Sequence, residues 1–258
     1  TEVAAGTPRV EVVSVTQEGK NATWTDPASG NQALLNDRPP LVLSAVVHYA
    51  DGRSFPITAI GVHQRSLIDV DSESPSGSTT AGDRVRKKRQ AQAVFLANLI
   101  QAMQAADPQR RIAVLGDFNA FEFNDGLVDP MNVVSGSPTP DDETAVPGDG
   151  VDLVNPNLMN LASLAPADQR YSYTFEGNAQ SLDHVLANQP LLDAVVGVAL
   201  DHPRINGDFP EVNRSAGDTP SRLSDHDPIV AYFRAEPVSF ADLSATASAN
   251  PANVDAGA

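Results

Sequence analysis

The alternation of apolar and polar positions divides the first half of the chain into strands. Residues 9–16 are rich in valine and roughly alternate, whereas residues 41–48 and 55–62 are more strongly apolar. Runs of β-branched side chains bounded by turn residues are typical of strands, and the Asp51-Gly52 pair predicts a hairpin between the last two. The polar segment at 17–36 is predicted to be a loop or an irregular hairpin.

Residues 84–105 follow a helical period instead. Their apolar side chains fall on one stripe, formed by Ala93, Leu96, Ala97, Ile100 and Met103. The predicted helix ends before Asp107-Pro108, and residues 112–115 then form a short apolar run that is typical of a buried strand. A helix followed directly by a buried strand indicates that the helix packs on one face of a sheet.

The second half of the chain is less regular. Residues 121–170 carry many Pro, Gly, Asn and Asp residues, and they are predicted to form an insert with one short helix near 158–164. Residues 171–175 and 181–187 are predicted to form a second hairpin, and 229–234 a last strand. We therefore expect one folded unit over residues 1–236, followed by an Ala, Ser and Pro-rich linker or tail over 237–258.

Candidate functional residues stand at the ends of these strands. Gly116 is predicted to turn the chain so that Asp117 and Asn119 emerge together, although an Asp-x-Asn sequence is more often an ordinary Asx turn. An acid within an apolar arm, such as Asp183, must either face solvent or pair with a specific partner, because its burial alone is costly. The remaining candidates are His63, Asp225 and His226.

Composition narrows the chemistry that these residues could perform. The 258-residue chain has a formal charge of −16, which argues against a general polyanion-binding surface, so a phosphate must be met locally by a metal ion or a few basic residues. The basic cluster at 84–89 is either a solvated helix start or a phosphate-contacting patch. The sequence has no cysteine, which excludes disulfides, cysteine-bound zinc and thiol nucleophiles.

Targeting signals are not evident in the sequence. It has no run of about 18 apolar residues that would predict a membrane span, and no basic and apolar start that would predict a signal peptide. Because the chain begins at Thr1 rather than at a methionine, we expect that a segment has been removed upstream.

The candidates complement one another as a site for phosphate-ester hydrolysis. A histidine hydrogen-bonded to a carboxylate is held in one tautomer, and its imidazolium form is stabilised, which suits general acid–base catalysis. A carboxylate that holds Mg²⁺, Mn²⁺ or Ca²⁺ would supply the Lewis acid that a strongly acidic protein otherwise lacks.

Several of these motifs resemble the endonuclease/exonuclease/phosphatase superfamily. The resemblance lies in Gly116–Ala120 (GDFNA), Ser224–Pro228 (SDHDP) and Leu182-Asp183, and it covers about residues 9–235. A finer similarity to secreted bacterial nucleases of that superfamily lies in Arg38–Leu41, Val62–Ser66, Arg89–Ala91 and Tyr171–His184.

The resemblance implies a fold and a role for each candidate. The implied fold is a four-layer α/β sandwich, in which two mixed β-sheets pack face to face with helices outside. His226 would be the general base oriented by Asp183, and Asp225 and Asp117 would bind a divalent metal, with Mg²⁺ the first expectation and Mn²⁺ or Ca²⁺ as alternatives. Asp117 and Asn119 would hold the nucleophile and the scissile phosphate, and His63 would bind the phosphate or assist the leaving group. His184 is expected to pack or hydrogen-bond, and Asp227 to cap a strand.

The family's early motifs precede the region that the chain matches, including a metal-binding glutamate. Gln17-Glu18 is only superficially similar to that motif, because it lies in a polar loop after the wrong element. We therefore expect the chain to be the C-terminal portion of such a domain and to be inactive, or nearly so, on its own. The uncovered sheet should associate with a second copy or with an upstream fragment of the same protein, or be buried under the chain's own polar loops.

The expected function is metal-dependent phosphodiester hydrolysis by an extracellular bacterial nuclease that acts on DNA or RNA. A phosphatase or phospholipid phosphodiesterase of the same fold is an alternative, because these activities share their catalytic residues. A non-catalytic binding module derived from the fold is a second alternative. The motifs leave open the substrate, the metal, endonuclease or exonuclease action, and the oligomeric state.

Overall fold

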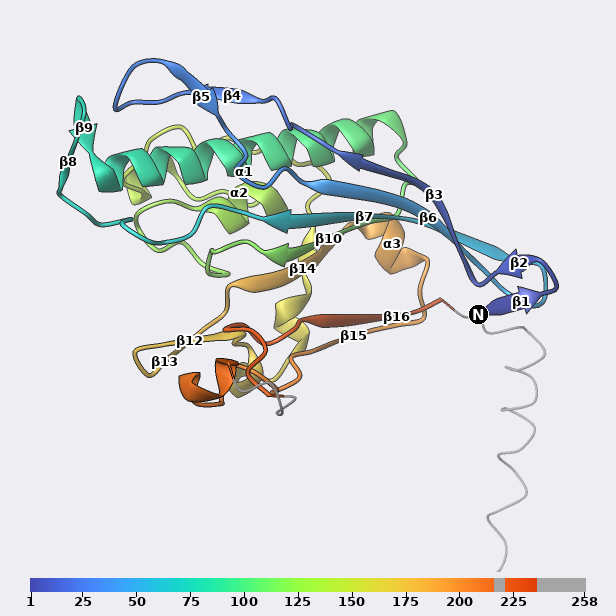
Figure 1. Cartoon of the computed structure of the whole chain (residues 1–258). Helices are drawn as coiled ribbons and strands as arrows, with labels where there is room; N and C mark the ends of the chain where they lie inside the picture. Colours follow the sequence, from blue (N-terminus) through green and yellow to red (C-terminus); the bar gives the residue numbers. More distant parts are fainter. Residues whose placement is uncertain (216–220, 236–258) are drawn as a thin grey trace, which may run out of the picture.

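The central element of the fold is a six-stranded mixed sheet crossed by one long helix (Figure 1). A computed structural model describes residues 1–215 and 221–235, so the predicted tail at 237–258 lies outside the described residues. The helices and strands are β1 Glu2–Ala4, β2 Thr7–Pro8, β3 Val10–Gln17, β4 Thr23–Thr25, β5 Gln32–Leu34, β6 Leu41–His48, β7 Ser54–His63, β8 Pro75–Ser76, β9 Thr79–Thr80, α1 Ala81–Ala106, β10 Ile112–Asp117, α2 Pro130–Ser135, β11 Met159–Asn160, β12 Tyr173–Phe175, β13 Asn178–Gln180, β14 Asp183–Ala187, α3 Gln189–Asp193, β15 Gly197–Asp201 and β16 Val230–Arg234.

The sheet order explains how distant segments meet. The strands follow the order β11-β14-β10-β7-β6-β3; β10 runs parallel to β7, and the other neighbours are antiparallel. The predicted strands at 9–16, 41–48 and 55–62 and the hairpin between the last two are confirmed. β10 is parallel to β7 and antiparallel to β14. The C-terminal ends of β7 and β10 and the N-terminal end of β14 therefore lie side by side at the same end of the sheet.

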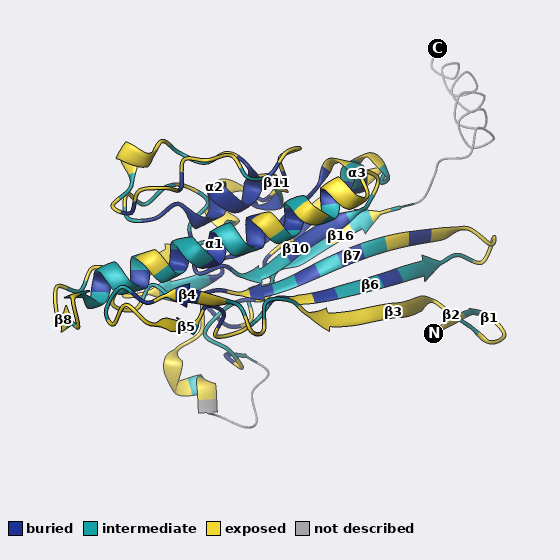
Figure 2. Ribbon diagram, turned by 90° about the horizontal axis from the view of Figure 1, so that it is seen from above, coloured by how far each residue is buried: buried dark blue, intermediate teal, exposed yellow. Residues whose placement is uncertain are grey.

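Helix α1 covers one face of the sheet with the predicted apolar stripe. Ala93, Leu96, Ala97 and Ile100 are buried against strand residues that include Ile60 and Val114 (Figure 2). The helix begins at the cap Thr80, whose side chain accepts a hydrogen bond from the backbone N–H of Asp83. Helix and sheet therefore enclose the larger of the two apolar cores.

The basic side chains at the start of α1 form ion pairs and hydrogen bonds with other parts of the fold. Arg84 pairs with Asp26, Lys87 with Asp83 and Lys88 with Asp37, at nitrogen–oxygen distances of 2.7–2.9 Å. Arg86 and Arg89 donate hydrogen bonds to the backbone carbonyls of Val70 and Arg65. Of the two interpretations of this cluster, the helix start therefore describes it better than a phosphate-contacting patch.

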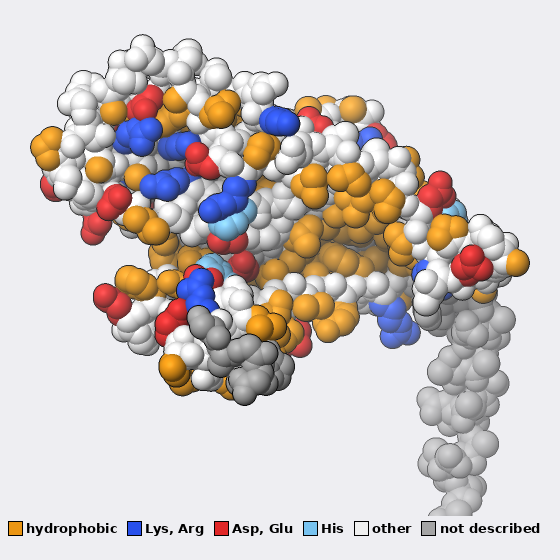
Figure 3. All heavy atoms as spheres, viewed as in Figure 1, with side chains coloured by type: hydrophobic (Ala, Val, Ile, Leu, Met, Phe, Trp, Pro, Cys, Tyr) orange, Lys and Arg blue, Asp and Glu red, His pale blue; other side chains and the backbone are white. Residues whose placement is uncertain are grey.

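The opposite face of the sheet is only partly covered. The β15–β16 pair packs there, and its Leu200 and Phe233 contribute to a second apolar core with Val185 and Leu161. The α/β class is confirmed, but the second sheet of the predicted sandwich has only two strands in the part of the chain that the structure describes. Where this cover ends, hydrophobic side chains gather at the surface (Figure 3). On β3 these include Val10, Val12 and Val15, which are 50%, 60% and 54% exposed.

Several local predictions were wrong. The strand at 112 continues through Gly116 to Asp117, so Gly116 does not make the turn. Residues 183–187 do not pair with 173–175; β12 pairs with β13 in a short hairpin, and β14 joins the central sheet. The short helix predicted near 158–164 is present as the 3-10 helix Leu161–Leu164, which is shorter than predicted because β11 occupies residues 159 and 160. None of the described helices is long and apolar enough to cross a membrane.

Candidate active site

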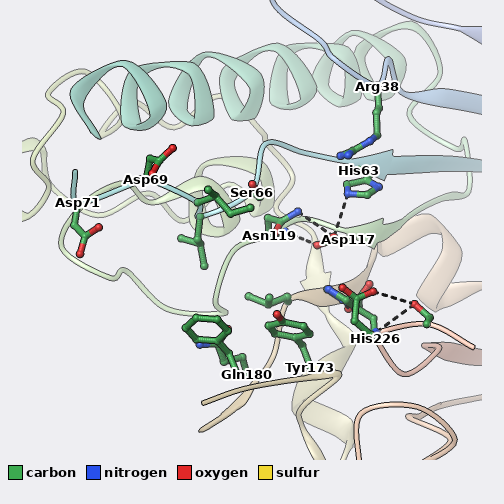
Figure 4. A pocket seen from close by; sticks show the side chains of 17 residues that line it. Arg38, His63, Ser66, Asp69, Asp71, Asp117, Asn119, Tyr173, Gln180 and His226 are labelled. Atoms are coloured by element: carbon green, nitrogen blue, oxygen red, sulfur yellow. Dashed lines mark hydrogen bonds and ion pairs between the residues drawn. The ribbon is translucent and has the colours of Figure 1, made fainter. Parts of the chain in front are cut away.

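Three candidates lie side by side because of the sheet register. Asp117, at the end of β10, is paired with His63 of β7 on one side and with Asp183 of β14 on the other. The side chains converge on a cavity of about 840 Å³, which is also lined by Asn119, Asp225 and His226 (Figure 4). The structure thus brings all six predicted site residues to one pocket.

Local backbone geometry aims Asp117 and Asn119 at this pocket. Gly116 has φ +135°, and a Cβ at this position would lie 2.1 Å from the carbonyl oxygen of Val62. Only glycine therefore allows β10 to lie this close to β7. Asn119 is in the left-handed region at φ 49°; its backbone N–H donates to Asp117 Oδ1 at 2.7 Å, and its side-chain amide donates to Asp117 Oδ2 at 2.9 Å. The Asx turn and the candidate site are therefore the same structure.

Asp183 and His226 form a hydrogen-bonded pair across the pocket. The Nδ1 atom of His226 lies 2.6 Å from Asp183 Oδ2, and the hydroxyl of Ser172 donates to the same oxygen at 2.6 Å. Ser172 is fully buried and also accepts the backbone N–H of Asp183, so the carboxylate is fixed from two directions. Because Nδ1 faces Asp183, the other ring nitrogen of His226, Nε2, is the one left for chemistry in the pocket.

Burial and neighbouring charges shift the pKa values of three groups in the pocket. Burial and the charge of Asp183 raise the pKa of Asp117 to about 6. Burial works against a charged His226, but the hydrogen bond and charge of Asp183 outweigh it and raise the pKa of His226. Burial and the nearby charges of Arg38 and His226 lower the pKa of His63, whose Nε2 lies 3.3 Å from Asp117 Oδ2.

Asp117, Asp183 and His226 could hold a metal ion, because each offers a ligand atom within 4.8 Å of the others. Burial first, and then the charge of Asp183, disfavour the ionised form of Asp117, and a divalent cation would offset both effects. Carboxylate oxygens are also the ligands that Mg²⁺, Mn²⁺ and Ca²⁺ prefer. The donor set therefore fits such an ion.

Asp225, which was predicted as a metal ligand, lies at the rim of the same pocket. Its carboxylate is 3.6 Å from Arg214 Nη2 and 3.4 Å from the hydroxyl of Ser224. It is not a member of the three-residue cluster formed by Asp117, Asp183 and His226. Its role as a ligand stays a prediction, and Arg214 would compete with a cation for its oxygens.

Three further residues lie at the site without having been predicted to act there. Arg38 lines the pocket with an exposed guanidinium group and has no hydrogen-bond or ion-pair partner among the described residues. The ring of Tyr173 lies 4.6 Å from the ring of His226, and Ser172 fixes Asp183. Arg38 and Tyr173 lie within segments that resemble the secreted nucleases, and that was their only signal in the sequence.

His184 packs and hydrogen-bonds as expected, whereas Asp227 has a structural role other than the expected strand cap. His184 is fully buried; its Nε2 is 2.9 Å from the carbonyl oxygen of Ala120, and burial lowers its pKa. Asp227 lies before β16 and accepts hydrogen bonds from Arg204 and from the backbone N–H groups of residues 205–207. Asp227 therefore fixes the loop before β16, directly beside His226.

Comparisons with known proteins give likenesses of structure. No family model and no curated protein matches the chain. A truncated TDP2 of Caenorhabditis elegans matches with TM-score 0.46 and 15% identity, over 89% of this chain and 68% of that one. An endonuclease/exonuclease/phosphatase family protein from Bacteroides thetaiotaomicron matches with TM-score 0.41 and 15% identity, over 86% of this chain and 65% of that one. The 3′ phosphatase NExo from Neisseria, bound to product DNA hairpin, matches with TM-score 0.40 and 16% identity, over 87% and 72%.

One of these structures bears the name of the family that the GDFN and SDHDP motifs resemble. The chain spans only 52% of another C. elegans TDP2 structure, at TM-score 0.47 and 16% identity. Likenesses at this level of identity concern the fold alone, so the activity has to be argued from the site.

Proposed function

We propose that this protein hydrolyses phosphodiester bonds in nucleic acid with the help of a divalent metal ion. The observation that carries the proposal is the Asp183–His226 pair, whose 2.6 Å hydrogen bond leaves Nε2 of His226 for the pocket. A histidine held in this way has one defined tautomer and a stabilised cationic form, which are the properties of a general base.

Each group around the pocket has a chemical part in this proposal. His226 removes the proton of the attacking water at Nε2, and Asp183 stabilises the imidazolium that forms. The guanidinium of Arg38 contacts phosphate oxygens, for which its fork of donors is suited. His63, whose lowered pKa keeps it neutral at pH 7, contributes a hydrogen bond to the phosphate or the leaving group.

Asp117 and Asn119 belong to the part of the pocket where phosphate and water would meet. Asp117 would hold the divalent metal, with Asp225 at the rim as a further candidate ligand, so that Nε2 of His226 stays free to act as the base. When bound, the ion supplies a Lewis acid that polarises a phosphoryl oxygen and offsets negative charge. This local positive charge would serve a protein whose overall charge of −16 repels polyanions.

The finer proposal is an extracellular bacterial nuclease. It is supported by the motif resemblance at Arg38–Leu41, Val62–Ser66 and Tyr171–His184, and by a sequence without cysteine. The alternatives of a phosphatase, a phospholipid phosphodiesterase and a non-catalytic module remain as outcomes of a substrate comparison.

The test removes the general base and leaves the other histidines in place. His226→Asn should lower the rate of DNA or RNA hydrolysis about 10² to 10⁴-fold. The matched control is His48→Asn, because His48 is also paired with an acid, Glu11, but does not line the pocket. The protein expressed from its complete reading frame is assayed beside residues 1–258, on plasmid DNA, RNA, sphingomyelin and a small synthetic phosphodiester.

Loss of hydrolysis in excess chelator, with recovery on added Mg²⁺ or Mn²⁺, is the second expected result. Undiminished hydrolysis by the His226 variant, or in excess chelator, would show that the mechanism is wrong. A clear preference for sphingomyelin or for a phosphomonoester would replace the nuclease assignment with one of the alternatives.

A further inference from the structure

One wall of the pocket is a strip of stacked aromatic rings. Tyr173 and Phe175 stand two residues apart on β12, so their side chains share one face of the strand. Their ring centroids are 6.4 Å apart with an angle of 16° between the planes, and Tyr173 lies in turn against His226 at 4.6 Å. The strip therefore leads from the proposed general base out to Phe175, which is 50% exposed.

The opposite wall also presents apolar side chains. Leu67 and Ile68 line the same cavity and belong to the loop after β7, between Ser66 and Asp69, which lie across the pocket from Tyr173 and Gln180 (Figure 4). Ile68 is 68% exposed, an unusual position for a large aliphatic side chain beside a polar pocket. The cavity is thus polar at its floor, where the acids and histidines lie, and apolar on two facing walls.

We propose that Phe175 and Ile68 hold an unpaired base of a single-stranded nucleic acid, next to the phosphate that is cleaved. This inference rests on the proposed function and narrows its substrate to strands whose bases are unstacked. Aromatic rings bind any base through its π-face, and a base inside a duplex does not offer that face. Gln180, opposite Tyr173 in the β12–β13 hairpin and also in the cavity wall, can donate to and accept from the edge of such a base.

The charged residues around the aromatic strip favour an unpaired base over a membrane as its ligand. Surfaces that enter a lipid interface combine a continuous apolar face with basic residues that attract anionic headgroups. Here the apolar loop is followed by Asp69 and Asp71, which line the same cavity, and Asp225 lies at its rim. Acidic residues close to the ring repel the many headgroups of an anionic membrane and also backbone phosphates, but a single base needs only one flat surface and a cation for the one phosphate beside it. Arg38, in the same cavity, provides that cation for the adjoining phosphate.

The test measures binding of a short fluorescent single-stranded oligonucleotide by anisotropy, in the His226→Asn background so that the oligonucleotide is not cleaved. Phe175→Ala should weaken this binding about tenfold, the usual effect of removing one base-stacking ring. Phe175→Trp should bind at least as well as the parent, and Ile68→Ala should show a smaller loss. The matched control is Phe123→Ala, because Phe123 is also an exposed, stacked phenylalanine, at 62% exposure and 5.3 Å from Phe121, and it lies outside the pocket.

A second measurement separates this inference from the proposed function. With His226 intact, Phe175→Ala should cleave a small synthetic phosphodiester at the parental rate, because that substrate has no base to stack. A raised KM for single-stranded DNA and an unchanged value for blunt duplex support the inference. Equal losses on both DNA forms, no loss on single strands, or no binding of single strands by the parent would each overturn it. Loss of binding to sphingomyelin vesicles alone would assign the strip to a membrane instead.

Discussion

At the residue scale, the proposed reaction depends on two groups that change charge near neutral pH. The pKa of His226 is raised above its ordinary value of 6.5, because the hydrogen bond and charge of Asp183 outweigh the effect of burial. The pKa of Asp117 is raised to about 6 by burial and by Asp183. A general base works in its neutral form, so hydrolysis should increase as pH rises through these values and level off above the pKa of His226. Since the two groups interact, the apparent midpoint belongs to both.

Asp183→Asn should move the midpoint of this pH–rate profile. The direction of that shift separates the effect of burial on the His226 pKa from the effect of Asp183. Without the hydrogen bond and charge of Asp183, burial is opposed only by the charges of Asp117 and Asp225, so the midpoint should move to lower pH. The maximum rate should fall about 10²-fold or more, because the ring loses its fixed tautomer. Full pH–rate profiles are compared at two metal concentrations, which shows whether added metal restores the rate. A midpoint that stays in place, or moves to higher pH, would contradict the role given to Asp183.

At the element scale, the site depends on the close approach of β10 to β7. Gly116→Ala places a Cβ where Val62 O lies at 2.1 Å, and the glycine already has φ +135°. We expect this variant to lose about 1–3 kcal/mol of unfolding free energy and to displace the adjacent Asp117, so activity falls more than stability. Gly61→Ala is the control, because it lies opposite Leu115 in the same strand pair and its new Cβ would meet its nearest neighbour at an ordinary 3.8 Å.

Urea unfolding and hydrolysis rates are measured for both variants. If Gly116→Ala kept parental stability and activity, the geometry argued for the end of β10 would be wrong. Similar losses in Gly61→Ala would show that any added methyl group disturbs this sheet, so the effect would not be specific to Gly116.

The positions of helices and strands could be predicted from the sequence better than which strands pair with one another. The strands at 41–48 and 55–62 and the helix at 84–105 have clear periods and turn signals, and the structure confirms them. The hairpin that begins at β12 turns at Glu176-Gly177, and both residues have positive φ, as a two-residue hairpin turn requires. Yet the second arm of that hairpin is the short polar strand Asn178–Gln180, because β14 is more apolar and is buried in the central sheet.

The same holds for the site: roles that follow from neighbouring sequence could be predicted, and roles that depend on contacts between distant residues could not. Asp183 was expected to need a partner because it stands in an apolar strand, and His226 is that partner. Arg38 and Ser172 could not be assigned roles, because each acts through residues far away in the sequence. An arginine before two prolines and a serine just before a short strand have no local pattern that distinguishes them from surface residues.

At the scale of the whole molecule, the central sheet combines an apolar face that the described residues cover only in part with a strong net charge. Val10, Val12 and Val15 of β3 pair with Val47, Ala45 and Leu43 of β6, so their side chains share one face. That face continues into the second core, which β15 and β16 cover only in part. Exposed apolar area of this kind favours association, whereas a formal charge of −16 opposes it.

We therefore predict that the chain self-associates through this face and that added salt strengthens the association, because salt screens the repulsion and leaves the apolar contact intact. Replacing Val12 and Val15 together with lysine should give a monomer at every salt concentration, since charged side chains on an exposed strand prevent such pairing. The control is Val212→Lys, because Val212 is 81% exposed but lies outside the sheet, and it adds positive charge without touching the apolar face. Sedimentation velocity over a range of protein and salt concentrations measures the outcome. A parental chain that stays monomeric throughout, or a Val212 variant that dissociates as completely as the double variant, would show that the β3 face is not where the molecules meet.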